Sequence, residues 1–400
     1  MTILDIERKK EIGLSPKAVQ KRPSALLFSL GKGLVYLVCL IFALEAFSYI
    51  VGVGDSEHIR PDRYLGYNLI AGKRVTQRKE GFGQFKINSF AMQNDEVKKE
   101  KPKGVYRIAI FGDSYVESLQ VARRANFLSR LQEKLNERLG RDGRNFKVEV
   151  LNFGVSNYST AQSYLRYKVL GSQFKPDLVI HNCRVEEVSK LLPMTTDNLL
   201  FVRPVLFADY SRHVTYDDTC VREYFQSAAG RRMLSFDWLR ANSRIWGVIS
   251  VMREQFGRFL ENPDLLLSFA PKAQPAASGL PTDETRANFT KCYWYMMDAQ
   301  LFNFARQCRS DGSDFMILRT PMIRPCQHTL TDNQIESDLL ARSAKDMKVE
   351  VLNLDERYRR WSGSTTDDGT NFSSGGHFTA VMHEWVAEQL AAKVYERLAK

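Results

Sequence analysis

Five short apolar segments alternate with segments of helical periodicity, and this alternation constrains the fold more than any other feature. Each apolar segment has the length and composition of a strand that is buried on both faces. The five segments cover residues 106–112, 147–154, 176–182, 313–321 and 348–355. Strands joined by helices pair in parallel through right-handed crossovers, so the sequence predicts an α/β domain with one five-stranded, doubly wound parallel sheet. In such sheets the chemistry gathers at the carboxyl ends of the strands.

Helices are expected between these strands and after the last one, because apolar residues recur there at helical spacing. Their expected ranges are 125–140, 159–174, 294–312 and 379–400. The sequence also predicts a helical insertion at about 190–290, between the third and fourth strands. Residues 55–105 show no strong period and are interpreted as a linker or extended lead-in to the domain of residues 106–400.

An apolar run over residues 33–54 is long enough to cross a bilayer as a helix. The preceding segment, residues 1–32, is basic, and this places it in the cytoplasm and the remaining chain outside. A single-pass signal anchor is therefore expected. A cleaved signal peptide is the second alternative, because no A-x-A cleavage site follows the apolar run. A surface helix is the third alternative. Glu45 lies within the run, so either it faces a partner helix or the span begins earlier, near Ser24.

Composition excludes several classes of function. Hydrophobic residues make up 44% and charged residues 26% of the 400 residues, which is typical of a globular chain. The net charge is +11, yet no zinc spacing or nucleic-acid motif occurs, so neither nucleic-acid binding nor a metal or other cofactor is expected. Cys183 is interpreted as a core residue. A disulfide within the following set is left open: Cys220, Cys292, Cys308 and Cys326.

Gly-Asp-Ser at residues 112–114 directly follows the first strand and is either an ordinary turn or a nucleophile site. A serine hydroxyl needs a base to take its proton, and a histidine does this near neutral pH. His377 precedes the last helix, so the topology brings it to the same sheet edge as Ser114. The backbone N–H groups of Ser114 and Gly154 are candidate donors to an oxyanion, and Asp113 is interpreted as a structural turn residue.

The chain resembles the SGNH hydrolases, also called GDSL esterases/lipases, of the membrane-anchored bacterial type. The segments that carry this resemblance are "KINSFAMQNDE", "RIAIFGDSYVESLQV", "VEVLNFGVSNYSTAQ", "PDLVIHN" and "HFTAVMHEWVAEQL". The resemblance implies a flavodoxin-like three-layer α/β/α sandwich that acts on esters, often O-acetyl groups of glycans. It also implies that Ser114 is the nucleophile, His377 the base and Gly154 the oxyanion glycine.

Two positions depart from the family pattern. Where an oxyanion asparagine is expected, the chain has Glu186 or Glu187, and Asn182 or Arg184 is the candidate substitute. The family's aspartate, two or three residues before the histidine, is replaced by Ser374 and Gly375. Asp368 is the candidate acid nearby, with Asp367 as the neighbouring alternative. The departures leave open a Ser-His dyad, another acid, or lost catalysis.

The leading hypothesis is a membrane-anchored serine esterase or O-acyltransferase. Its substrate would be an acyl ester of an extracytoplasmic glycan, and the family resemblance implies an acetyl ester. Its domain would face the periplasm from the inner membrane. The two reactions share an acyl-enzyme and differ in whether water or a sugar hydroxyl arrives second. The alternative is a catalytically impaired binding or assembly subunit of a polysaccharide-export system, with polysaccharide-assembly proteins as partners.

Overall fold

The computed structural model divides the chain into two compact units, Met1–Val53 and Gly54–Lys400. Both hydrophobic cores of the larger unit are built from residues between Ile59 and Tyr395, so this unit has what it needs to fold without the first. The residues described are 25–54, 57–78, 80–184, 190–194, 196, 198–261, 283–321, 330–362 and 376–399.

In the described residues of the smaller unit there is one helix, α2 (Ala25–Val51), which is apolar on all sides. Its segment Phe28–Val51 has a mean hydropathy of 2.3 and is a candidate transmembrane helix by length and composition. Its 24 residues correspond to about 36 Å of helix, enough to cross a hydrocarbon core of about 30 Å. The helix begins close to Ser24, and Glu45 lies roughly 9 Å from its carboxyl end. These positions agree with the alternative expectation, in which the span begins near Ser24 instead of at residue 33.

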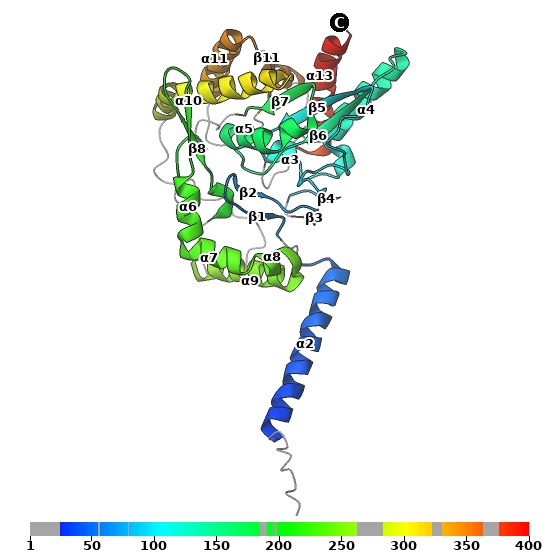
Figure 1. Cartoon of the computed structure of the whole chain (residues 1–400), viewed down its shortest axis with the longest axis vertical. Helices are drawn as coiled ribbons and strands as arrows, with labels where there is room; N and C mark the ends of the chain where they lie inside the picture. The colour runs from blue at the N-terminus through cyan, green and yellow to red at the C-terminus, as the bar shows by residue number, and fades with distance from the viewer. Residues whose placement is uncertain are drawn as a thin grey trace, which may run out of the picture. The chain divides into compact units, whose positions relative to one another are not determined.

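The larger unit is built on one five-stranded parallel sheet with the order β11-β10-β7-β5-β6 (Figure 1). The strands are β5 (Val105–Phe111), β6 (Lys147–Asn152), β7 (Leu178–Asn182), β10 (Asp314–Arg319) and β11 (Glu350–Asn353). These are the five predicted strands, and the predicted doubly wound α/β fold is confirmed. Because β6 and β7 flank β5 on opposite sides, the order reverses at the strand that precedes Ser114.

Helices cover both faces of this sheet and bury a separate core on each (Figure 1). Alternate residues of β5 point to opposite cores: Ile108 and Ile110 to one, Ala109 and Phe111 to the other. The first core is closed by α4 (Phe127–Arg141), α12 (Asp355–Ser362) and α13 (Ala380–Leu398). The second is closed by α5 (Thr160–Val169), α10 (Asp283–Ser310) and α11 (Leu330–Met347). The Asn126 side chain caps α4, and a capping box of Ser159 and Gln162 begins α5.

The lead-in differs from the linker interpretation because it is folded onto the sheet domain. It forms two antiparallel hairpins, β1 (Ile59–Asp62) with β2 (Gly66–Leu69) and β3 (Arg74–Gln77) with β4 (Gly83–Lys86). Its apolar side chains join the second core: Ile59, Leu65, Tyr67, Leu69, Val75, Phe85, Ile87 and Met92. Strands of four residues are too short to give a clear period, which is why the sequence showed none.

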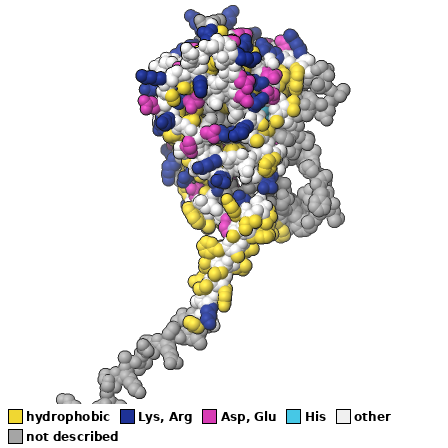
Figure 2. Space-filling model, turned by 90° about the vertical axis from the view of Figure 1, so that its right-hand side faces the viewer, with side chains coloured by type: hydrophobic (Ala, Val, Ile, Leu, Met, Phe, Trp, Pro, Cys, Tyr) yellow, Lys and Arg dark blue, Asp and Glu magenta, His cyan; other side chains and the backbone are white. Residues whose placement is uncertain are grey.

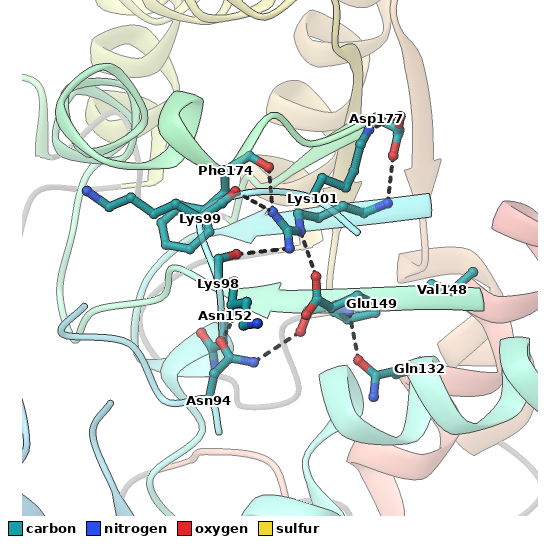
Figure 3. A network of polar contacts seen from close by, with 12 residues as sticks. Asn94, Lys98, Lys99, Lys101, Gln132, Val148, Glu149, Asn152, Phe174 and Asp177 are labelled. Atoms are coloured by element: carbon teal, nitrogen blue, oxygen red, sulfur yellow. Dashed lines mark hydrogen bonds and ion pairs between the residues drawn. The ribbon is translucent and has the colours of Figure 1, made fainter. Parts of the chain in front are cut away.

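The buried Arg107 of β5 fixes the last part of the lead-in (Figure 3). Its Nε donates to Glu149 at 2.6 Å, and its two terminal nitrogens donate to the carbonyl oxygens of Lys98, Lys99 and Phe174 at 2.7–3.1 Å. Its backbone N–H donates to Asp177 at 2.7 Å. One guanidinium therefore joins the lead-in, two strands and the loop before β7.

Side-chain amides satisfy the outer edge of β6. Asn136 bonds to both the N–H and the carbonyl of Val148 at 2.8 Å, and Gln132 accepts from the N–H of Val150 at 2.8 Å. Asn94 donates to the carbonyl of Val150 at 3.0 Å and accepts from the N–H of Asn152 at 2.6 Å (Figure 3). These amides do for the edge what a further strand would do.

The insertion between β7 and α10 contains, in the described residues, the 3-10 helix η4 (Leu199–Phe201), then a hairpin and four α-helices. The elements are β8 (Val205–Ala208), β9 (Val214–Asp217), α6 (Thr219–Gln226), α7 (Ala228–Ser235), α8 (Asp237–Asn242) and α9 (Arg244–Glu261). The five described cysteines form no disulfide with one another, and Cys183 is buried, as expected. Cys326 lies outside the described residues.

Candidate active site

A tight turn after β5 presents Ser114 as the first residue of the one-turn helix α3 (Ser114–Glu117). The Asp113 carboxylate caps this helix by accepting from the N–H of Tyr115 at 3.1 Å. Gly112 is required because a Cβ there would lie 2.6 Å from Val116 and 3.1 Å from the Cβ of Asn182. Gly-Asp-Ser is therefore a turn that also sets a hydroxyl at the carboxyl end of the central strand.

His377 meets Ser114 although 263 residues separate them. Its Nε2 lies 2.8 Å from the Ser114 Oγ, within the reach of a general base. The loop that carries the histidine is held by Tyr115, whose hydroxyl donates to the carbonyl of Gly376 at 3.0 Å. The rings of Tyr115 and His377 also lie 4.9 Å apart. The residue after the serine thus positions the histidine that lies against the serine.

The acid next to the histidine is Glu80, which the sequence analysis missed. One Glu80 oxygen lies 2.6 Å from His377 Nδ1, and the other accepts from the backbone N–H of His377 at 2.8 Å. An ionised carboxylate only accepts hydrogen bonds, so this contact places the proton on Nδ1 and leaves Nε2 free to accept from the serine. Glu80 is 8% exposed, so little water competes for its oxygens.

Glu80 reaches the histidine because it lies in the loop between β3 and β4. Gly83, at the start of β4, packs directly on the chain that follows α3: a Cβ there would lie 2.1 Å from the carbonyl oxygen of Leu119. The family pattern predicts the acid just before His377 in the sequence. Glu80 instead lies 297 residues before it, in a segment without helix or strand periodicity. Nothing in the sequence distinguishes Glu80 from other acidic residues. Asp367 and Asp368 lie outside the described residues.

Gly154 lies against the nucleophile helix, with its backbone N–H already engaged. A Cβ on Gly154 would lie 2.3 Å from the amide nitrogen of Glu117, so only glycine allows this close approach. Its N–H donates to Oδ1 of Asn152 at 2.9 Å, and Nδ2 of Asn152 donates to the carbonyl of Val116 at 2.9 Å. To stabilise an oxyanion, Gly154 would have to share or break its bond to Asn152.

Asn182 ends β7, beside the nucleophile turn, and is 1% exposed. Its Oδ1 accepts from the Thr320 hydroxyl at 3.1 Å, which orients the amide. Its Nδ2 is buried and finds no hydrogen-bond partner among the described residues. A buried donor without a partner is costly in a finished fold, and it is suited to a site where an acceptor arrives with the substrate.

Two cations accompany Asp113 at the edge of the site. Burial opposes ionisation of this carboxyl, but Lys190, Arg184 and the Tyr115 N–H outweigh burial and hold its pKa below the usual range. The Arg184 guanidinium stacks on Tyr115, with Cζ 3.2 Å from the ring centroid. Glu186 and Glu187 lie outside the described residues. Within the described part of the chain, no group of three His, Cys, Asp or Glu residues is arranged to hold a metal ion.

Comparison with known proteins finds similar solved structures but no matching family model and no matching curated protein. An acetyl xylan esterase, AlAXEase, is 12% identical, with 72% of this chain and 99% of that chain covered and a TM-score of 0.38. TesA is 13% identical, with coverage of 71% and 95% and a TM-score of 0.36. The acetylxylan esterase Axe2 of Geobacillus stearothermophilus is 9% identical, with coverage of 72% and 94% and a TM-score of 0.38. At these values the likenesses assign neither a family nor a substrate to this chain.

Proposed function

We propose that this chain is a serine ester hydrolase of the SGNH type, with Ser114 as nucleophile, His377 as base and Glu80 as the acid that orients it. The observation that carries the proposal is the continuous line of hydrogen bonds from Glu80 through His377 to Ser114, with separations of 2.6 and 2.8 Å. This is the arrangement that activates a serine hydroxyl. The quoted sequence segments support the SGNH type independently.

In the proposed reaction, Nε2 of His377 takes the Ser114 proton while Oγ attacks the ester carbonyl carbon. The carbonyl oxygen becomes an oxyanion, for which the Ser114 N–H and Nδ2 of Asn182 are the proposed donors, with Gly154 as a third if its bond to Asn152 opens. The imidazolium, paired with Glu80, returns the proton to the leaving alcohol. Water, activated in the same way, then releases the acid and restores Ser114.

We further propose that the acyl group is acetyl, that the acceptor is a glycan outside the cytoplasm, and that α2 anchors the domain on the periplasmic side. Motif resemblance supports the first two points, and the basic residues before α2 support the third. Acyl transfer to a sugar hydroxyl remains an extension of the same chemistry. The assembly-subunit alternative rested on two departures from the family pattern, the missing oxyanion asparagine and the missing acid before His377. The contact of Glu80 with His377 speaks against the second.

Fluorophosphonate labelling and hydrolysis of 4-nitrophenyl acetate test the proposal with the purified protein. We expect one labelled serine and measurable turnover, both abolished in Ser114→Ala. Ser172→Ala is the matched control. Ser172 lies in the 3-10 helix Gly171–Phe174 after α5, and its hydroxyl donates to the carbonyl of Lys168 at 3.4 Å, so both signals should persist. Equal background rates in the wild type and Ser114→Ala, without labelling, would refute the esterase proposal.

A further inference from the structure

The insertion helices expose a concentrated apolar surface. Half of the exposed large hydrophobic side chains described in the larger unit lie between residues 234 and 256. Trp238 is 72%, Met252 65% and Phe256 60% exposed. We call the following set the apolar face of α7–α9: Leu234, Phe236, Trp238, Leu239, Ile249, Met252 and Phe256. Such a concentration on a protein surface marks a contact with something apolar.

The apolar face follows helical geometry. Ile249, Met252 and Phe256 are spaced by three and four residues, which places them on one side of α9. Phe236 stacks on Trp246 with ring centroids 5.2 Å apart, so α8 and α9 are joined at this surface. Figure 2 shows hydrophobic side chains gathered at the lower end of the larger unit. The surface is therefore a continuous feature of packed helices.

Contacts at the start of the larger unit place the helices of this surface next to residues 54–60. A Cβ on Gly54 would lie 2.1 Å from the carbonyl oxygen of Arg244, the first residue of α9. The N–H of Glu57 donates to the carbonyl of Arg240 at 3.2 Å, and Arg60 pairs with Asp237 at 3.0 Å. The helices α8 and α9 thus pack on the residues that directly follow α2.

The segment that joins the end of α2 to Gly54 is short, and its length does not depend on the orientation of the two units. The helix α2 ends at Val51, three residues before Gly54, and three residues span at most about 11 Å. If α2 crosses a bilayer, the beginning of α9 is held at the level of the lipid headgroups. The helix α9 has 18 residues and is about 27 Å long, so much of its apolar side can lie along the membrane.

Charge and side-chain type agree with this location. Arg231, Arg232 and Arg253 are exposed on α7 and α9, where they can meet anionic headgroups. Tryptophan is favoured at the membrane–water interface because its ring is apolar and its N–H is polar, and Trp238 is the most exposed member of the apolar face. Helices with exposed apolar and basic residues bind in the plane of the interface.

We propose that the apolar face of α7–α9 lies in the outer headgroup layer of the membrane that α2 crosses. This inference rests on the anchoring part of the proposed function. The protein would then be held by two contacts, the spanning helix and the apolar face of α7–α9, and its catalytic domain would keep a fixed height and tilt above the bilayer. One flexible connection alone would leave the domain free to turn.

Co-sedimentation with lipid vesicles tests the proposal. The protein used is residues 54–400, which lacks α2, so any binding to the vesicles comes from the larger unit. The vesicles contain phosphatidylglycerol and phosphatidylcholine in equal parts. We expect the unaltered domain to bind and Trp238→Glu/Met252→Glu to bind at least tenfold more weakly. Val381→Glu is the matched control, since Val381 is 52% exposed on α13, outside the apolar face, and should bind as before.

Thermal unfolding by circular dichroism checks that the variants fold. Ser114→Ala should bind vesicles like the wild type, so a failure of the esterase proposal leaves this test intact. No binding by the unaltered domain, or binding that survives the double substitution, overturns the proposal. A dimer that the double substitution dissociates, with no vesicle binding, would assign the apolar face to a second copy and overturn it as well.

Discussion

The proposed histidine base pairs with a carboxylate from a residue that precedes the proposed nucleophile in the chain. Glu80 holds both Nδ1 and the backbone N–H of His377, so it fixes the ring and the loop that carries it. Sequence reasoning brought Ser114 and His377 to one sheet edge because each follows or precedes a strongly patterned element. It missed Glu80 because a hairpin loop is placed by tertiary packing, which has no local signature in the sequence.

We expect Glu80→Gln to lower kcat for 4-nitrophenyl acetate by about 10³–10⁴-fold. The amide keeps the size of the side chain but loses the charge that stabilises the imidazolium and selects its tautomer. Asp368→Asn is the comparison, and its kcat should stay within about twofold of the wild type. A large loss of kcat in Asp368→Asn with little loss in Glu80→Gln would show that Asp368, not Glu80, is the acid partner of His377.

Asn182 has a buried donor without a hydrogen-bond partner among the described residues, and we propose that it binds the oxyanion of the substrate. We expect Asn182→Ala to lower kcat by about 10²–10³-fold with little change in KM, because the lost hydrogen bond forms mainly in the transition state. Thr320→Val removes only the hydroxyl that orients the amide, so its loss should be smaller. Steady-state kinetics of both variants check this, and an unchanged kcat in Asn182→Ala would exclude it as an oxyanion donor.

The β3–β4 hairpin is the element that connects the lead-in with the active site. The five sheet strands were predictable because each is a buried apolar run, whereas the hairpins have strands of four residues and half-exposed faces. The contact of Gly83 with Leu119 places the β3–β4 hairpin. The contacts of Arg107 with Lys98 and Lys99 place the end of the lead-in. The lead-in therefore belongs to the catalytic domain.

Gly83→Ala should displace this hairpin, because its Cβ would meet a backbone oxygen that cannot move without the nucleophile turn. We expect at least a tenfold loss of kcat and a lower melting temperature. Gly140→Ala, in α4, meets nothing within 4 Å, and it should leave kcat unchanged and raise stability by up to about 1 kcal/mol. Full activity in Gly83→Ala would show that Glu80 does not depend on the packing of β4.

At the scale of the whole molecule, the proposed anchor α2 would determine which compartment the domain meets. The basic residues before α2 predict a cytoplasmic N-terminus and an external C-terminus. An alkaline phosphatase reporter fused after Lys400 should therefore be active in a Gram-negative host, and a cytoplasm-dependent fluorescent reporter fused there should be dark. The reverse pattern would invert the topology and place the esterase domain in the cytoplasm.

Two buried histidines make the stability of the larger unit depend on pH. Burial lowers the pKa of His181 to about 4, and burial together with the nearby His377 lowers the pKa of His383 to about 3, against 6.5 for an ordinary histidine. The folded state keeps both neutral while the unfolded chain takes up protons, so stability is complete above pH 6.5. It falls as the pH decreases from 6.5 toward 4 and 3, by up to about 1.4 kcal/mol per pH unit for each histidine.

Urea unfolding of residues 54–400 at pH 6.5 and pH 5.0 measures this effect. We expect the free energy of unfolding to fall by about 2–4 kcal/mol between the two values. His181→Gln and His383→Gln should each reduce this difference, even if they also lower stability at pH 6.5. His213→Gln changes an exposed histidine and should leave the difference as it is. A difference that neither buried substitution alters would contradict the assignment.

The amide-covered edge of β6 matters most for a protein confined to a membrane. If α2 anchors the protein, its copies diffuse in two dimensions and collide repeatedly, conditions in which an open strand would pair with its counterpart on the next molecule. Asn94, Gln132 and Asn136 occupy the N–H and carbonyl groups of β6 that such pairing would need. Three uncharged side chains thereby close this edge of the sheet to another copy.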